Sequence, residues 1–107
     1  MNILLACQLG VTTSMLADRM EKYAASMNGD IHAWAVDFLE IQQEVAKKKI
    51  DCILLGPQIS YRLKDIKEEL AEYDIPIEVI SYTDFGTMNV KNIIEKVQKT
   101  LKENKNE

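Results

Sequence analysis

The chain is short of the residues that mark several specialised classes of protein. Its 107 residues include two cysteines and one histidine, too few and too far apart for a disulfide scaffold or a His/Cys metal site. No apolar run approaches the roughly 20 residues that a membrane-spanning helix needs. The formal net charge is −4, and Lys and Arg form no extended basic block, which disfavours nucleic-acid binding. We therefore expect no metal, no other cofactor and no nucleic-acid partner.

The first residues also lack the pattern of a secretory signal. No basic stretch precedes the apolar run at Ile3, and that run is too short. We expect a cytoplasmic protein with reduced cysteines. Hydrophobic residues make up 47% and charged residues 28% of the chain, which is typical of a globular protein. This length fits one domain with an adequate core. We expect that domain over residues 1–103, followed by a frayed polar tail over 104–107.

Short apolar runs alternate four times with helical patterns, which predicts an α/β fold with a parallel sheet. Strands are expected at Asn2–Ala6, Ile31–Val36, Asp51–Leu55 and Ile77–Ile80. Helices are expected over Thr13–Met27, from Phe38 to Lys49, from Gln58 to about Leu70, and from Val90 to Leu101. A loop is expected over Ser81–Asn89.

The composition of the strands predicts their order. The first and third are continuously apolar and belong at the centre of a parallel sheet, whereas the second mixes Ala, His and Trp and suits an edge. The expected fold is an open four-stranded parallel sheet of order 2-1-3-4, with right-handed crossovers and helices on both faces. Ligands of such sheets bind beyond the carboxyl ends of the strands, where the chain direction reverses. Cys7 lies at one side of that crevice, and Gly56-Pro57-Gln58 lies at the other.

Cys7 is the candidate nucleophile, because it ends a strand and precedes a loop and a helix. The loop N–H groups and the helix dipole would favour a thiolate and an attached phosphate. Gly10 is suited to a positive φ or a close approach to phosphate. The candidate phosphate-binding residues, none of them charged, are Gln8, Leu9, Gly10, Val11, Thr12, Thr13 and Ser14. A plain capped strand-to-helix turn with a buried, inert cysteine is the alternative interpretation.

The functional hypothesis depends on the absence of an arginine from the loop that follows Cys7. Small cysteine phosphatases on this architecture carry a loop of form Cys-x5-Arg, in which the Arg grips the phosphate. Here the sixth residue after Cys7 is Thr13, and the nearest arginine is Arg19 in the helix. The site has a nucleophile and an anion cradle without the cation that drives hydrolysis. This favours a protein that accepts a phosphoryl group and passes it on.

Two blocks of sequence resemble a known family. The stretch Cys7-x-x-Gly10-x-Thr12-Thr13-Ser14-Met15-Leu16 is similar to the phosphocysteine loop of the enzyme IIB component of the bacterial sugar phosphotransferase system, in its lactose/cellobiose (diacetylchitobiose) branch. A second block, Leu54-Leu55-Gly56-Pro57-Gln58-Ile59-x-Tyr61, is similar to the segment that follows the third strand in that family. The resemblance covers essentially the whole chain, although Gln8 and Leu9 replace the smaller residues common there.

The resemblance implies a fold like that of low-molecular-mass tyrosine phosphatases and a role as phosphoryl carrier. Cys7 would accept a phosphoryl group from a phosphohistidine of the IIA component. It would pass the group to a sugar, such as cellobiose, chitobiose or lactose, that is imported by the membrane component IIC. The protein would be cytoplasmic and would dock at the inner face of the membrane. Pro57, Gln58 and Tyr61 are candidates for partner docking, and Pro57 is equally suited to starting a helix.

Two other classes of function remain open on the sequence. One is a phosphatase or arsenate reductase on the same fold, which Thr13 in place of arginine disfavours. The other is a non-enzymatic domain in which phosphorylation of Cys7 acts only as a switch.

The remaining reactive residues are interpreted structurally. Cys52 begins the third strand, at the opposite end from Cys7, so a disulfide between them is implausible and Cys52 is expected to pack in the sheet. His32 lies in the expected edge strand without a second ligand or base. Asp84 is expected to be a solvated loop residue or a partner contact. Met15, Met20 and Met27 are expected to fill gaps in the core or to cover the loop.

Overall fold

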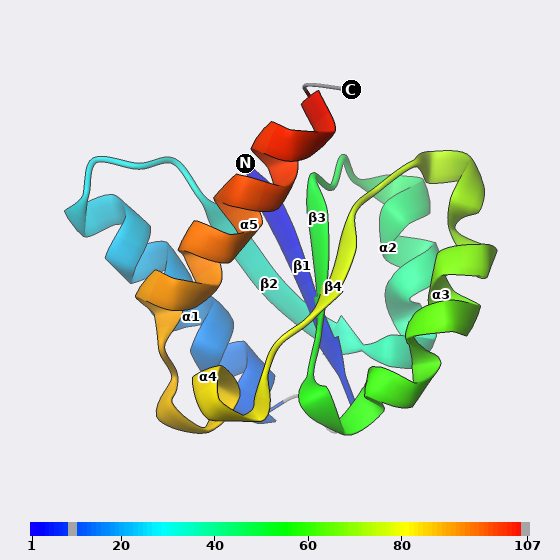
Figure 1. The fold of residues 1–107 in the computed structure, drawn as a ribbon, viewed down its shortest axis with the longest axis horizontal. Helices are drawn as coiled ribbons and strands as arrows, with labels where there is room; N and C mark the ends of the chain where they lie inside the picture. Colours follow the sequence, from blue (N-terminus) through cyan, green and yellow to red (C-terminus); the bar gives the residue numbers. More distant parts are fainter. Residues whose placement is uncertain (9–10, 106–107) are drawn as a thin grey trace.

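A parallel sheet of four strands forms the middle layer of the molecule (Figure 1). This computed structural model describes residues 1–8 and 11–105. The strand order β2-β1-β3-β4 is the predicted one, and the central positions of β1 and β3 are confirmed. The strands are β1 (Asn2–Cys7), β2 (His32–Asp37), β3 (Cys52–Leu55) and β4 (Ile77–Val79).

Helices cover both faces of the sheet, as predicted (Figure 1). On one face lie α1 (Val11–Ser26), α4 (Tyr82–Thr87) and α5 (Val90–Lys105). On the other lie α2 (Ile41–Lys47) and α3 (Leu63–Glu69). The described part of the chain also contains the 3₁₀ helices η1 (Phe38–Glu40), η2 (Pro57–Arg62) and η3 (Ala71–Tyr73).

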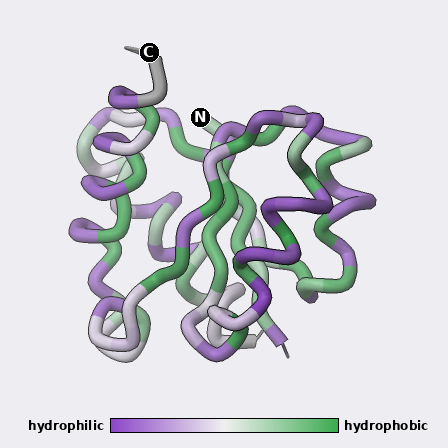
Figure 2. The backbone as a smooth tube through the Cα atoms, turned by 45° about the vertical axis from the view of Figure 1, so that its right-hand side comes forward, coloured by the Kyte–Doolittle hydropathy of each residue, from purple (hydrophilic) through white to green (hydrophobic). Residues whose placement is uncertain are grey.

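The two faces of the sheet bury separate hydrophobic clusters, because successive strand residues point to opposite sides. Ile3 and Leu5 of β1 pack with α1 and α5, whereas Leu4 and Ala6 pack with α2 and α3. All four are fully buried. Figure 2 shows the result as hydrophobic strands enclosed by helices of mixed hydropathy. The core therefore holds β1 rigidly on both sides up to its last residue, Cys7.

Several predicted boundaries are corrected by the structure, among them the helix predicted from Phe38 to Lys49, which begins as the 3₁₀ helix η1 and is α-helical only over Ile41–Lys47. The segment Ser81–Asn89 is not a loop throughout, since it contains α4, capped by the Ser81 side chain, which accepts from the Asp84 N–H. The helix predicted from Gln58 begins as the 3₁₀ helix η2 and becomes α-helical at Leu63. The polar residues 102–105 continue α5, and residues 106–107 lie outside the described part of the chain.

Candidate functional site

Cys7 is the last residue of β1 and lies level with Asp37 of the neighbouring strand β2. Its side chain is only 4% exposed. Helix α1 begins at Val11, so its amino end follows Cys7 closely in the chain. The predicted loop residues Leu9 and Gly10 lie outside the described residues, and the side chain of Val11 is likewise not described. Gln8 is exposed. The predicted position of Cys7, at the carboxyl end of the sheet in front of a helix, is confirmed.

One hydroxyl of the predicted cradle contacts the Cys7 sulfur. Thr13 Oγ1 donates to Cys7 Sγ at 2.6 Å, and Thr13 is fully buried. The neighbouring Thr12 and Ser14 are exposed, so the three hydroxyls predicted together occupy different environments. A donor on the sulfur orients its lone pairs and stabilises negative charge that develops there. The residue at the position of the phosphatase arginine thus supplies a neutral hydrogen bond.

Gly56, just after β3, lies beside Cys7. The Gly56 N–H donates to Ala6 O at 2.8 Å, which extends the β1–β3 pairing by one residue. A Cβ added to Gly56 would lie 3.1 Å from Cys7 Cβ and 3.1 Å from Gln58 Oε1. Contacts that short require neighbouring atoms to move. Any preference for glycine here comes from this close approach, because the φ of −62° is accessible to any residue.

The second predicted block forms η2 beside Cys7. Pro57 is the first helical residue of η2 and is buried, a position for which its fixed φ is suited. Gln58 is exposed, and Tyr61 is 70% exposed. The structure therefore presents Gln58 and Tyr61 to solvent at this end of the sheet and turns Pro57 inward.

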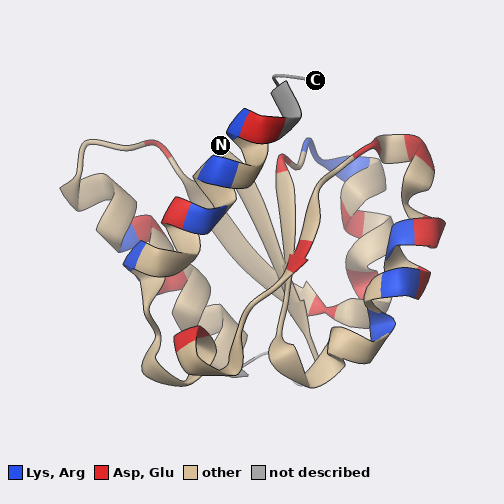
Figure 3. Ribbon diagram, viewed as in Figure 1, with Lys and Arg blue, Asp and Glu red and all other residues tan. Residues whose placement is uncertain are grey.

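Large apolar side chains are exposed on the elements that follow each strand. They are Met15 (48%) on α1, Leu39 (75%) on η1, Tyr61 (70%) on η2 and Tyr82 (70%) on α4. We call these four residues the carboxyl-end rim. Figure 3 shows that charged residues gather on α3 and α5, whereas the ribbon at the carboxyl ends of the strands carries few of them. The elements that follow the strands therefore expose apolar side chains at the carboxyl end of the sheet.

The prediction that Asp84 is a solvated loop residue is wrong. Its side chain is 7% exposed and accepts from Asn92 Nδ2 at 3.0 and 2.9 Å and from Lys96 Nζ at 3.1 Å. These hydrogen bonds, led by that of Asn92, lower the pKa of Asp84 below its ordinary value. The carboxylate is ionised at neutral pH and ties α4 to α5, so Asp84 does not resemble the general acid of a phosphatase, which must hold a proton. The spacing Ser81-x-x-Asp84 is a capping signature from which α4 could have been found.

The other reactive residues lie away from Cys7. Cys52 pairs with Ile3 at the opposite end of β1, both cysteines are free, and burial raises the pKa of the Cys52 thiol to about 12. His32 is exposed on the edge strand β2, with Nε2 at 3.5 Å from Asp30 Oδ1. Within residues 1–8 and 11–105 no cluster of three or more His, Cys, Asp or Glu side chains is arranged to hold a metal ion.

The predicted roles of the methionines are only partly correct. Met20 is buried in the core, but Met15 is 48% and Met27 is 66% exposed. Met15 thus belongs to the surface near Cys7, and Met27 lies at the far end of α1.

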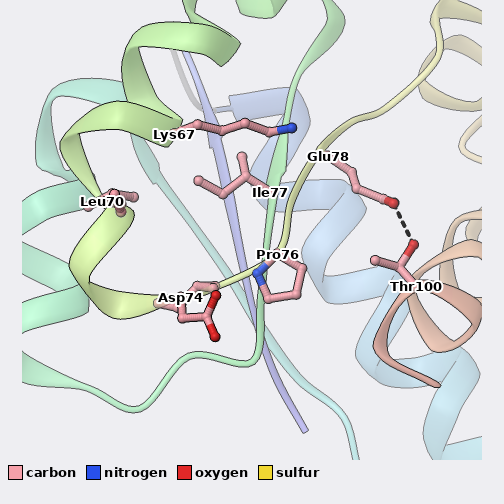
Figure 4. A pocket seen from close by; sticks show the side chains of 9 residues that line it. Lys67, Leu70, Asp74, Pro76, Ile77, Glu78 and Thr100 are labelled. Carbon is pink, nitrogen blue, oxygen red and sulfur yellow. Dashed lines mark hydrogen bonds between the residues drawn. The ribbon is translucent and has the colours of Figure 1, made fainter. Parts of the chain in front are cut away.

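A groove of about 380 Å³ lies along the start of the edge strand β4, between α3 and α5. Figure 4 shows Lys67 and Leu70 on one side and Thr100, hydrogen-bonded to Glu78, on the other. Ile77 in its floor lies level with Ile53 and Leu4, three residues short of Cys7. The groove is therefore separate from the thiol.

None of the helices in the described part of the chain has the length and apolar character needed to cross a membrane.

Comparison with known proteins points to one family. A family model described as the lactose/cellobiose-specific IIB subunit of the PTS system matches residues 2–96. The chain is 34% identical over 93 residues to the oligo-beta-mannoside-specific EIIB component of Bacillus subtilis, covering 87% of this chain and 88% of that protein. It is 30% identical over 95 residues to the cellobiose-specific EIIB component of Lactococcus lactis, covering 86% and 88%.

Solved structures agree with the observed fold. The solution structure of a cellobiose-specific phosphotransferase IIB component from Borrelia burgdorferi superposes with a TM-score of 0.77 at 36% identity, over 96% of this chain and 93% of that one. A lactose-specific IIB domain from Streptococcus pneumoniae gives a TM-score of 0.75 at 17% identity, over 95% of both chains, a likeness of fold alone.

Proposed function

The chain belongs to the lactose/cellobiose-specific IIB family of the phosphotransferase system, and from this we propose that Cys7 is the residue that carries the phosphoryl group. The observation that carries the proposal is the 2.6 Å hydrogen bond from Thr13 to the Cys7 sulfur. This hydrogen bond distinguishes Cys7 from Cys52. The Cys52 thiol is fully buried in the central strand β3, and because burial raises its pKa it stays neutral. The neutral hydroxyl in place of arginine suits a group that is held and passed on.

The transfer conserves atoms and charge. The Cys7 sulfur attacks the phosphorus of a phosphohistidine on the donor, so that an S–P bond forms as the N–P bond breaks. The imidazole nitrogen that leaves takes up one proton, which balances the proton given up by the thiol. Thr13 donates to the sulfur and so favours the thiolate that attacks in this step. A sugar hydroxyl then attacks the same phosphorus, the S–P bond breaks, and the hydroxyl proton balances the thiolate that is regenerated.

The proposed partners are those of a IIB component. The donor is phosphorylated IIA, and the acceptor is a sugar held by the membrane component IIC, with this chain acting in the cytoplasm at the inner face of the membrane. The sugar we propose is a β-linked disaccharide such as cellobiose, chitobiose or lactose. The names of two relatives, specific for oligo-beta-mannoside and cellobiose, support this class.

The carboxyl-end rim is the surface on which we expect both partners to dock. Cys7 is 4% exposed, so a donor must approach it closely from the carboxyl end of the sheet. The rim lies on elements that follow the strands at that end, and its exposed side chains include Tyr61 and Tyr82; tyrosine is enriched where proteins meet. Exposed apolar patches of this kind mark interaction sites.

The experiment is a phosphoryl-transfer assay with IIA that carries labelled phosphate. We expect wild-type protein and Cys52→Ala to take up the label, in a linkage that mass spectrometry at neutral pH maps to Cys7, and Cys7→Ser to take up none. Equal labelling of Cys7→Ser would contradict the assignment. Hydrolysis of an aryl phosphate by wild type that is lost in Cys7→Ser would indicate a phosphatase instead.

A further inference from the structure

Gln58 is an exposed polar side chain beside Cys7 for which the transfer described above has no role. Its Oε1 and the Cys7 Cβ both lie 3.1 Å from the point where Gly56 would carry a side chain. The two atoms are therefore no further apart than twice that distance. No hydrogen bond of the Gln58 carboxamide occurs with any residue that the structure describes.

Its placement depends on a feature of the backbone rather than on chance exposure. Gly56 N–H is fixed to Ala6 O at 2.8 Å, and the next residue, Pro57, is buried at the start of η2. The backbone on the amino side of Gln58 is thus held by the sheet and by the core. With no side chain on Gly56, the carboxamide oxygen of Gln58 and Cys7 Cβ both lie beside the position that a Cβ would occupy.

A carboxamide can bind a phosphoryl group by hydrogen bonds that are weak enough to allow its later transfer. It offers two N–H donors without a formal charge. A half-turn about the last side-chain torsion exchanges the oxygen and nitrogen positions, so the same side chain presents N–H₂ when an anion arrives. An arginine would bind the dianion more strongly and stabilise its transfer to water.

We propose that the Gln58 carboxamide donates a hydrogen bond to the phosphoryl oxygens of phosphorylated Cys7, as the neutral substitute for the missing arginine. This inference rests on the proposed function of Cys7. Thr13 contacts the sulfur from α1, Gln58 reaches the phosphoryl group from η2, and Gly56 provides the gap between them.

The test compares Gln58→Glu and Gln58→Ala with wild type, with Gln98→Glu as the matched control. Gln98 is an exposed glutamine of α5 that lies beside Met1, at the other end of the sheet. Gln58→Glu keeps the shape of the side chain and replaces a donor with an anion. We expect it to slow phosphoryl uptake from IIA by about tenfold or more, with Gln58→Ala intermediate and Gln98→Glu unchanged. Because Gln58 is exposed, we expect thermal unfolding to be the same in all four proteins.

A second readout separates phosphoryl binding from docking. After IIA is removed, the ³¹P resonance of the phosphoprotein is titrated with pH. We expect its midpoint to lie higher in Gln58→Glu, because a nearby carboxylate disfavours the phosphoryl dianion. An unchanged midpoint in Gln58→Glu and Gln58→Ala overturns the inference, even where uptake is slower. Absence of label on Cys7 in the wild-type protein overturns the proposed function and this inference with it.

Discussion

Thr13 Oγ1 donates to Cys7 Sγ across 2.6 Å, and neither side chain is more than 4% exposed. The two residues come from different elements, the last position of β1 and the first turn of α1. The hydrogen bond therefore couples the thiol to the helix whose amino end follows it. In the phosphatase pattern this position carries a charged arginine, and here it carries a buried hydroxyl that acts on the sulfur.

Removal of that hydroxyl tests its role. Thr13→Val retains the branched shape but cannot donate, so the Cys7 thiolate that must form before attack loses one hydrogen bond. We expect phosphoryl uptake from IIA to fall roughly ten- to a hundredfold, the range for a hydrogen bond to a charged group. Stopped-flow or quench measurements of single-turnover uptake give the rate. Thr100→Val is the control, because Thr100 bonds Glu78 beside the groove of Figure 4. Equal rates for Thr13→Val and wild type would contradict the role.

The close approach of Gly56 to Cys7 can be tested by adding a side chain to Gly56, with Gly86 as the control. Gly56→Ala places a Cβ 3.1 Å from Cys7 Cβ and Gln58 Oε1, so we expect both side chains to shift. The free energy of unfolding should fall by about 1–3 kcal/mol, as for overpacking, and uptake should fall with it. In Gly86→Ala the new Cβ meets no atom within 4 Å, and stability should stay the same or rise by up to about 1 kcal/mol. Urea denaturation measures both, and equal effects of the two substitutions would contradict the close contact.

The sheet could be predicted because its central strands contain runs of consecutive apolar residues that are long enough to be recognised in the sequence. Continuous apolar runs marked β1 and β3 as central, and helical periodicity located α1 and α5. The contacts at the site could not be predicted in the same way. Which of Thr12, Thr13 and Ser14 faces Cys7 depends on where α1 begins and on its rotation against the sheet. The approach of Gly56 to Cys7 likewise depends on the register between β1 and β3.

Asp84 shows a second reason why some contacts could not be predicted from the sequence. Helix α4 has only six residues, too few for a periodic apolar pattern to stand out. The carboxylate is buried because Asn92 and Lys96, on α5, fold over it. That arrangement is set by the packing of one helix on the other, which composition does not reveal. Only the Ser81-x-x-Asp84 spacing carried a local signal.

The lowered pKa of Asp84 predicts an acid-dependent contribution to stability. The free carboxyl titrates at 3.8, and its hydrogen bonds to Asn92 and Lys96 place the folded value lower. Its contribution is therefore fully present above pH 3.8 and is lost as the pH falls through the folded pKa. We expect Asp84→Asn to be less stable than wild type at neutral pH, and the difference to narrow in acid. Urea denaturation at pH 7 and at about pH 3 measures this, and a constant difference would contradict the ion pair.

The raised pKa of Cys52 predicts that stability is lost in alkali rather than in acid. Its thiol titrates at 9.0 when free and at about 12 in the folded chain, chiefly because of burial. The neutral thiol thus favours the folded state below pH 9, and this contribution is lost as the pH rises from 9 toward 12. We expect wild type to lose more stability than Cys52→Ala over that interval, in guanidinium titrations at several pH values. At pH 8 we expect alkylating reagents to spare Cys52 until the protein unfolds. Rapid labelling of Cys52 in the folded protein would contradict its burial.

The carboxyl-end rim predicts how partners bind. Leu39→Ser and Tyr61→Ser each remove an apolar side chain that is at least 70% exposed, so the fold should not be weakened. We expect each to raise the KM for phosphorylated IIA several-fold and the pair to raise it by tenfold or more, as for interface residues worth about 1 kcal/mol or more each. The maximal rate should change little, because neither residue touches Cys7 Sγ. Met27→Ser, which changes a side chain that is 66% exposed just after the carboxyl end of α1, is the matched control. Equal effects of Met27→Ser and Tyr61→Ser would place the docking surface elsewhere.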